Sequence, residues 1–122
     1  MIENIELLKE FIVKCLEEKK AEDILVIDIK QKTTLAEYII FASGRSTKNV
    51  GAIAEYLSLE LKNQANVNTN IEGLAQSEWV LIDAGNILVN IFYPETREHF
   101  KLEEMWRKKN KLKILDFLLK TT

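Results

Sequence analysis

The fold of this chain is decided by one stretch, Glu78-Trp79-Val80-Leu81-Ile82-Asp83-Ala84-Gly85-Asn86-Ile87-Leu88-Val89-Asn90-Ile91-Phe92. Two runs rich in β-branched and aromatic residues flank a short polar segment. That segment, Asp83-Ala84-Gly85-Asn86, is a strong signal for a hairpin turn. We therefore predict two antiparallel strands, joined by a turn whose two central residues are Ala84 and Gly85.

The two predicted strands present different residues on their two faces, because strand side chains alternate between faces. One face is wholly aliphatic and reads as core: Val80, Ile82, Ile87, Val89 and Ile91. The other face is mixed: Trp79, Leu81, Asp83, Leu88, Asn90 and Phe92. The predicted turn places Trp79 opposite Asn90 and Leu81 opposite Leu88. A mixed face of this kind suits protein recognition through an aromatic anchor. It is equally consistent with a face that helices cover, where Trp79 would be a core residue.

The segments on either side of the hairpin complete a mixed α/β (α+β) pattern. A stripe of Ile5, Leu8, Ile12, Cys15 and Leu16 at helical spacing predicts a helix over 3–20. A second stripe, Val50, Ile53, Ala54, Leu57 and Leu61, follows Ser46 or Thr47 as the helix cap. We predict the order α-β-β-α-β-β-β-α, a mixed five-stranded sheet packed with helices. The remaining elements are strands at 23–29 and 38–44, an extended segment at 71–74, and helices over 95–109 and 111–119.

Composition favours a protein partner over nucleic acid. The chain has 122 residues, a length that suits one domain, and a net charge of −2. Bases outnumber acids only in residues 101–122, so nucleic-acid contact would be secondary. Cys15 is the single cysteine, the start resembles neither a signal nor a transit peptide, and no apolar run approaches the roughly 20 residues that span a bilayer. We expect a cytoplasmic protein with no membrane contact.

The sequence contains few candidate residues for catalysis. One histidine, His99, and one cysteine are too few for a zinc site. The segment Ser43-Gly44-Arg45-Ser46 joins a predicted strand to a helix, where it could cradle a phosphate or simply form a turn with a helix cap. The carboxylate pair that a nucleotidyltransferase needs for two metal ions is missing. We predict no catalytic residues, no metal and no cofactor, and we keep a nucleotidyltransferase-like enzyme as the alternative.

Several of these segments, in this order and spacing, resemble the Iojap/RsfS family of ribosomal silencing factors. They are Tyr38-Ile39-Ile40-Phe41-Ala42-Ser43-Gly44-Arg45-Ser46, Ile71-Glu72-Gly73-Leu74, Glu78 to Gly85, Val89-Asn90-Ile91-Phe92, Pro94-Glu95-x-Arg97 and Leu102-Glu103-x-x-Trp106. The resemblance covers about 2–108. It implies a nucleotidyltransferase-like fold without catalysis. It also implies binding to ribosomal protein fourteen (uL14) of the large subunit, where the factor blocks joining of the small subunit and represses translation.

The resemblance also implies which residues meet the partner. The family's contact tryptophan and aspartate fall on Trp79 and Asp83, and Asn90 stands where the family has a histidine. We therefore expect partner binding through Trp79, Leu81, Asp83, Leu88 and Asn90. The domain would span 1–109, and 110–122 would be a basic amphipathic extension that packs on the domain, pairs two copies into a homodimer or touches ribosomal RNA. An RNA-binding ribosome assembly factor is the remaining alternative.

Overall fold

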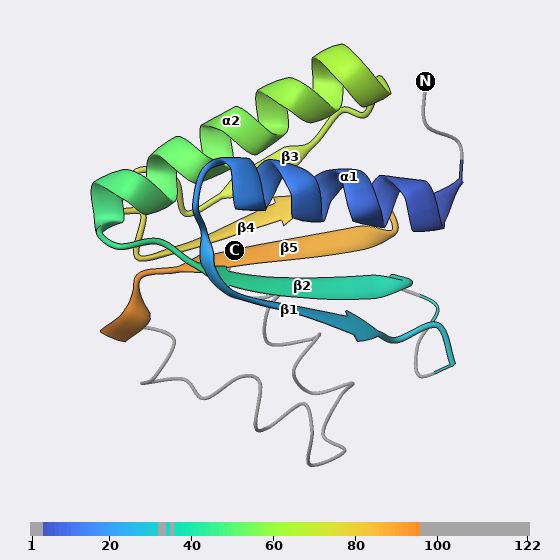
Figure 1. Ribbon diagram of the computed structural model, residues 1–122, viewed down its shortest axis with the longest axis horizontal. Coiled ribbons are helices and arrows are strands. Elements are labelled where there is room, and N and C mark those ends of the chain that lie inside the picture. Colours follow the sequence, from blue (N-terminus) through green and yellow to red (C-terminus); the bar gives the residue numbers. More distant parts are fainter. Residues whose placement is uncertain (1–3, 32–33, 35, 96–122) are drawn as a thin grey trace.

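The computed structural model describes residues 4–31, 34 and 36–95, which form a five-stranded sheet with two helices (Figure 1). The predicted order is confirmed through the fifth strand. The helix expected over 95–109 and the extension over 110–122 lie outside the described residues, apart from Glu95. The elements are α1 (Ile5–Glu18), β1 (Glu22–Asp28), β2 (Tyr38–Ser43), α2 (Thr47–Ala65), β3 (Asn70–Glu72), β4 (Trp79–Asp83) and β5 (Ile87–Phe92).

Both helices begin at a side-chain cap and bury the predicted stripe. The Asn4 side chain accepts hydrogen bonds from two backbone N–H groups of the first turn of α1, and Ser46 accepts one from the N–H of Asn49 in α2. The α2 stripe is buried throughout; in α1, four of the five stripe residues are buried and Ile5 packs at the margin. α2 ends at Asn66, which adopts the left-handed conformation. No helix in residues 4–31, 34 and 36–95 is long and apolar enough to cross a membrane.

The sheet has the strand order β1-β2-β5-β4-β3. β2 and β5 run parallel at its centre, and every other neighbouring pair is antiparallel. The parallel pair requires a crossover, which contains α2. Figure 1 shows α1 and α2 side by side on one face of the sheet, which we call the helix face. The aliphatic residues predicted as core, among them Val80 and Val89, lie on that face and are buried.

The hairpin register differs from the prediction by two residues. Trp79 lies opposite Phe92, and Leu81 lies opposite Asn90. The turn consists of Gly85 and Asn86, because the Ala84 N–H donates to the carbonyl of Ile87. Gly85 has a φ of +82°, and a glycine with positive φ at the first central position is the pattern of a type II′ turn. The turn therefore begins at the residue with no Cβ, one position later than predicted.

Candidate functional site

The face opposite the helices, which we call the second face, contains its own apolar cluster. Every residue of the mixed hairpin face lies here, since a register shift of two leaves each side chain on its side. Leu81, Leu88 and Phe92 pack with residues of β2 and with the segments flanking it. The other members of the cluster are Ile29, Ala36, Ile39 and Phe41, with Leu25, Ile27 and Trp79 at its margin.

Three aromatic rings cross the second face in a row. The ring of Phe92 lies 5.2 Å from that of Trp79 and 6.2 Å from that of Phe41, and both pairs are stacked. The indole Nε1–H of Trp79 donates a 3.0 Å hydrogen bond to Oδ1 of Asn90. Trp79 is thus oriented by a ring below it and by an acceptor at its edge. Phe41 was not expected at this site, because only the β2–β5 pairing brings it beside the hairpin.

The five predicted contact residues share this face but differ sharply in exposure. Leu81 and Leu88 are 3% exposed and Asn90 is 0% exposed, so these three side chains do not reach the surface. Trp79 and Asp83 are half-buried and do reach it. They lie at opposite ends of β4. The arrangement is a rigid apolar support with one aromatic and one acidic group at its margins.

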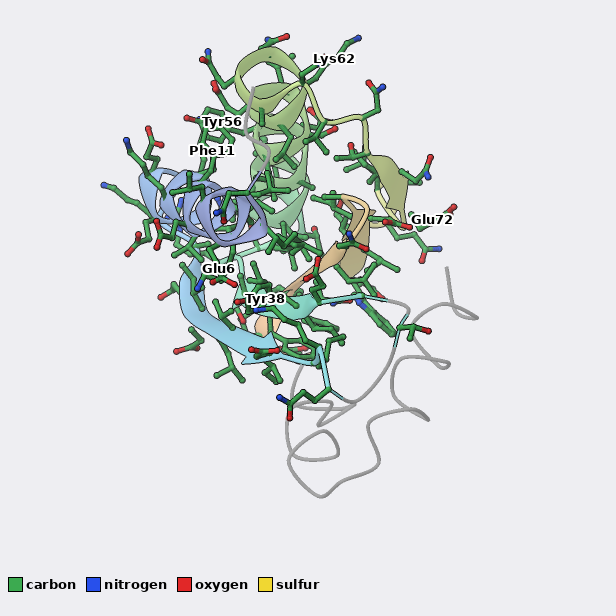
Figure 2. All side chains as sticks on the ribbon, turned by 90° about the vertical axis from the view of Figure 1, so that its right-hand side faces the viewer. Glu6, Phe11, Tyr38, Tyr56, Lys62 and Glu72 are labelled. Atoms are coloured by element: carbon green, nitrogen blue, oxygen red, sulfur yellow. The ribbon has the colours of Figure 1, made fainter. Side chains whose placement is uncertain are left out.

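Asp83 combines a structural contact with an exposed position. Its Oδ1 accepts a 2.9 Å hydrogen bond from the N–H of Gly85, which holds the hairpin turn. The edge strand β3 adds two exposed polar residues on the same face: Asn70 pairs with Asp83, and Glu72 pairs with Leu81. Figure 2 shows Glu72 at this outer edge of the sheet. The margin formed by Asn70, Glu72 and Asp83 is therefore polar and acidic, a feature that only the strand pairing reveals.

The segment Ser43-Gly44-Arg45-Ser46 was predicted either to cradle a phosphate or to form a turn with a helix cap. In the structure, its Arg45 N–H and its Ser46 hydroxyl both bond to Asn49 at the start of α2. Ser46 Oγ accepts from the N–H of Asn49 at 3.1 Å, and Asn49 Oδ1 accepts from the N–H of Arg45 at 2.9 Å. Ser43 is buried. These contacts favour the turn with a helix cap. Among the residues that the structure describes, no three His, Cys, Asp or Glu side chains gather where they could hold a metal ion.

A charged cluster that the sequence did not predict joins α1 to the sheet. Lys30 Nζ lies 2.8 Å from Glu6 Oε1 and 3.0 Å from the hydroxyl of Tyr38, and that hydroxyl donates to Glu6. Figure 2 shows Glu6 and Tyr38 close together where the helix passes the strand. Hydrogen bonds from Lys30 and then from Tyr38 lower the pKa of Glu6 to about 2. The hydrogen bonds of Lys30 to Glu6 and then to Tyr38 raise the pKa of Lys30. These residues are 24 or more positions from Glu6, so no local pattern could reveal them.

The single cysteine has the environment of a structural thiol. Cys15 is buried in the helix-side core, as its place on the apolar stripe predicted. Burial raises its pKa to about 11, with the carboxylates of Glu18 and Glu60 adding to the shift. A thiol with this pKa stays protonated near neutral pH and is a poor nucleophile.

The structure is a small mixed α/β domain whose second face carries an apolar cluster with Trp79 and Asp83 at its margins. A sequence model of the family "Ribosomal silencing factor during starvation" matches residues 2–121. The chain is 38% identical to the ribosomal silencing factor RsfS of Zymomonas mobilis over 101 residues, which span 83% of this chain and 76% of that protein. The chain belongs to the ribosomal silencing factor family.

Solved structures agree with this assignment. A crystal structure of a protein from Chromobacterium violaceum superposes with a TM-score of 0.81 at 32% identity, over 85% of this chain and 87% of that one. A protein from Bacillus halodurans gives a TM-score of 0.73, also at 32% identity, over 84% and 95% of the two chains. The fold class predicted from the sequence is confirmed.

The mouse protein "Mitochondrial assembly of ribosomal large subunit protein 1" is 31% identical over 80% of this chain and 44% of its own length.

Proposed function

We propose that this chain docks on the large ribosomal subunit, against ribosomal protein fourteen, and blocks joining of the small subunit. Family membership supports a role in silencing ribosomes. The observation that carries the docking proposal is the half-buried Trp79, which is stacked on Phe92 at the margin of the apolar cluster of the second face. Tryptophan anchors of this kind supply a large share of the binding free energy in protein interfaces.

The second face offers the partner two kinds of contact. Trp79 provides an apolar surface at one end of β4, and Asp83 provides a carboxylate at the other. Leu81, Leu88 and Asn90 support these two groups from beneath, because they are at most 3% exposed. The acidic margin, with Asn70 opposite Asp83 and Glu72 opposite Leu81, fits a partner surface that carries lysine or arginine side chains. We therefore place direct contact at Trp79 and Asp83.

The proposed action is steric and needs no covalent step. A bound domain of this size occupies the surface that the small subunit would meet. We accordingly propose that the chain is not an enzyme and works in the cytoplasm. The capping role of Ser46 supports the proposal that the chain is not an enzyme, since the Ser46 hydroxyl already accepts a hydrogen bond from the first turn of α2.

A subunit-joining assay tests the proposal. Purified large and small subunits are mixed with the full-length protein and separated on a sucrose gradient, and the joined and free subunits are measured. We expect the protein to sediment with large subunits, and the fraction of joined ribosomes to fall as protein is added. Binding to large subunits without any change in joining would contradict occlusion. Failure to bind large subunits at all would contradict the docking itself.

A role in assembly of the large subunit is the second candidate function. It is supported by the mouse relative, whose name refers to assembly of the large ribosomal subunit. Contact with ribosomal RNA through the basic residues 101–122 would give this role a steep dependence on salt. Binding to large subunits, measured between about 50 and 200 mM salt, distinguishes RNA contact through residues 101–122 from docking on a protein. A shallow dependence favours docking on a protein through the second face.

A further inference from the structure

Asn90 is an anomaly on the second face. It lies in the middle of β5, with Phe41 of β2 and Leu81 of β4 as its lateral neighbours, and its side chain is 0% exposed. An amide buried among aromatic and aliphatic groups lowers stability unless its hydrogen bonds are made. Oδ1 accepts from Trp79, but Nδ2 has no hydrogen-bond partner among the described residues. The side chain is therefore only half satisfied, at a position whose lateral neighbours are apolar.

Among the described residues, the Asn90 side chain makes one hydrogen bond, and its donor is a residue that reaches the surface. Stacking on Phe92, with an angle of 27° between the rings, sets the plane of the Trp79 indole. The bond to Oδ1 sets the direction of its Nε1 edge within that plane. Together these contacts restrict both side-chain torsions of Trp79 before any partner arrives. An aromatic anchor that is already oriented loses less conformational entropy on binding.

We propose that Asn90 is a positioning residue: it never touches the partner, and it holds the Trp79 indole in the orientation that the partner protein recognises. This inference rests on the proposed docking through the second face. It assigns to the buried amide a role in affinity rather than in folding. It also explains why a half-satisfied polar group occupies an apolar environment, since an apolar residue cannot accept from Nε1.

The role predicts opposite effects on stability and on binding. Asn90→Leu replaces the unsatisfied donor by an apolar side chain with the same branching, and the half-buried Trp79 can then turn its Nε1–H toward water. We expect the melting temperature to stay the same or rise. We expect affinity for large subunits to fall about three- to tenfold, the change that corresponds to immobilising one additional side chain on binding. A residue with a purely structural role would not separate the two measurements in this direction.

The test compares Asn90→Leu, Asn90→Asp and Trp79→Phe in the full-length protein. Affinity for purified large subunits and the melting temperature are measured for each, together with the indole N–H signal of Trp79 in a 15N-correlated NMR spectrum. Trp79→Phe removes that signal and so distinguishes it from the signal of Trp106. Asn90→Leu should shift the Trp79 signal. Asn90→Asp retains an accepting oxygen at the same position, and it should restore both the signal and the affinity.

The outcomes separate this inference from the proposal on which it rests. The double variant Asn90→Leu/Trp79→Phe should bind no more weakly than Trp79→Phe, because both changes remove the same hydrogen bond. If Trp79→Phe weakens binding while Asn90→Leu binds like the parent, the positioning role is refuted and the docking face stands. If neither change affects binding, the docking face itself is refuted. Should Asn90→Leu fail to fold, loss of binding by a folded Asn90→Asp protein would overturn the inference.

Discussion

Replacing Trp79 by alanine should weaken binding to the large subunit far more than a matched change on the helix face. The variant removes the stack on Phe92 and the hydrogen bond to Asn90. Each contributes about 0.5–1.5 kcal/mol in addition to the burial of the indole, so we expect the free energy of unfolding to fall by at least about 2 kcal/mol. Truncating an interface anchor costs at least about 2 kcal/mol of binding, which is about thirtyfold in affinity.

Val80→Ala is the control for this prediction. Val80 is the next residue of β4, is 0% exposed, and points into the helix-side core. Removing its two methyl groups should also cost about 2 kcal/mol of stability, through lost burial and the cavity that remains. Both variants are therefore destabilised, but they differ in the face of the sheet that they alter. Only Trp79→Ala should lose affinity.

The assay is co-sedimentation of each folded variant with purified large subunits, at a temperature well below both melting transitions. Circular dichroism during heating supplies the melting temperatures. Equal losses of affinity for Trp79→Ala and Val80→Ala would show that binding follows stability alone. A large drop in the melting temperature of Trp79→Ala with unchanged affinity would place Trp79 in the core and refute the reasoning.

Three further changes test other parts of the structure. Ser46→Ala removes the α2 cap and should lower stability by about 1 kcal/mol in a denaturant titration, and neither it nor the parent should turn over nucleotides with magnesium or manganese. Gly73→Ala should lower the free energy of unfolding by at least about 2 kcal/mol, because φ is +86° and a Cβ would collide with the carbonyl oxygen of Trp79. Gly85→Ala is the control: φ is +82° but the space around it is open, so we expect a loss of about 1 kcal/mol. Equal losses for the two variants would contradict the collision. The pKa of Glu6 is lowered to about 2 from its usual 4.5, so the stability that ionised Glu6 contributes is complete above about pH 4.5 and is lost as the pH falls toward 2. The free energy of unfolding, measured between about pH 2 and 6, should therefore fall less steeply for Glu6→Gln than for the parent protein. Identical pH profiles for the two proteins would refute this link.

The sequence by itself determined the elements and the face on which each hairpin residue lies. Helical stripes and capping residues predicted α1 and α2, because these signals are local. Strand alternation assigned Trp79, Leu81 and Asn90 to one face correctly even though the register was wrong. A shift of two residues preserves the face of every side chain, so alternation cannot distinguish the two registers.

The tertiary structure alone decided how those residues are used. The parallel pairing of β2 with β5 brings Phe41 beside Asn90, and the type II′ turn at Gly85 sets Trp79 opposite Phe92. These contacts join positions far apart in the chain and depend on how whole strands pack. The same packing buries Asn90 fully and Trp79 only in part, a difference in exposure between two neighbours on one face that no periodicity in the sequence encodes.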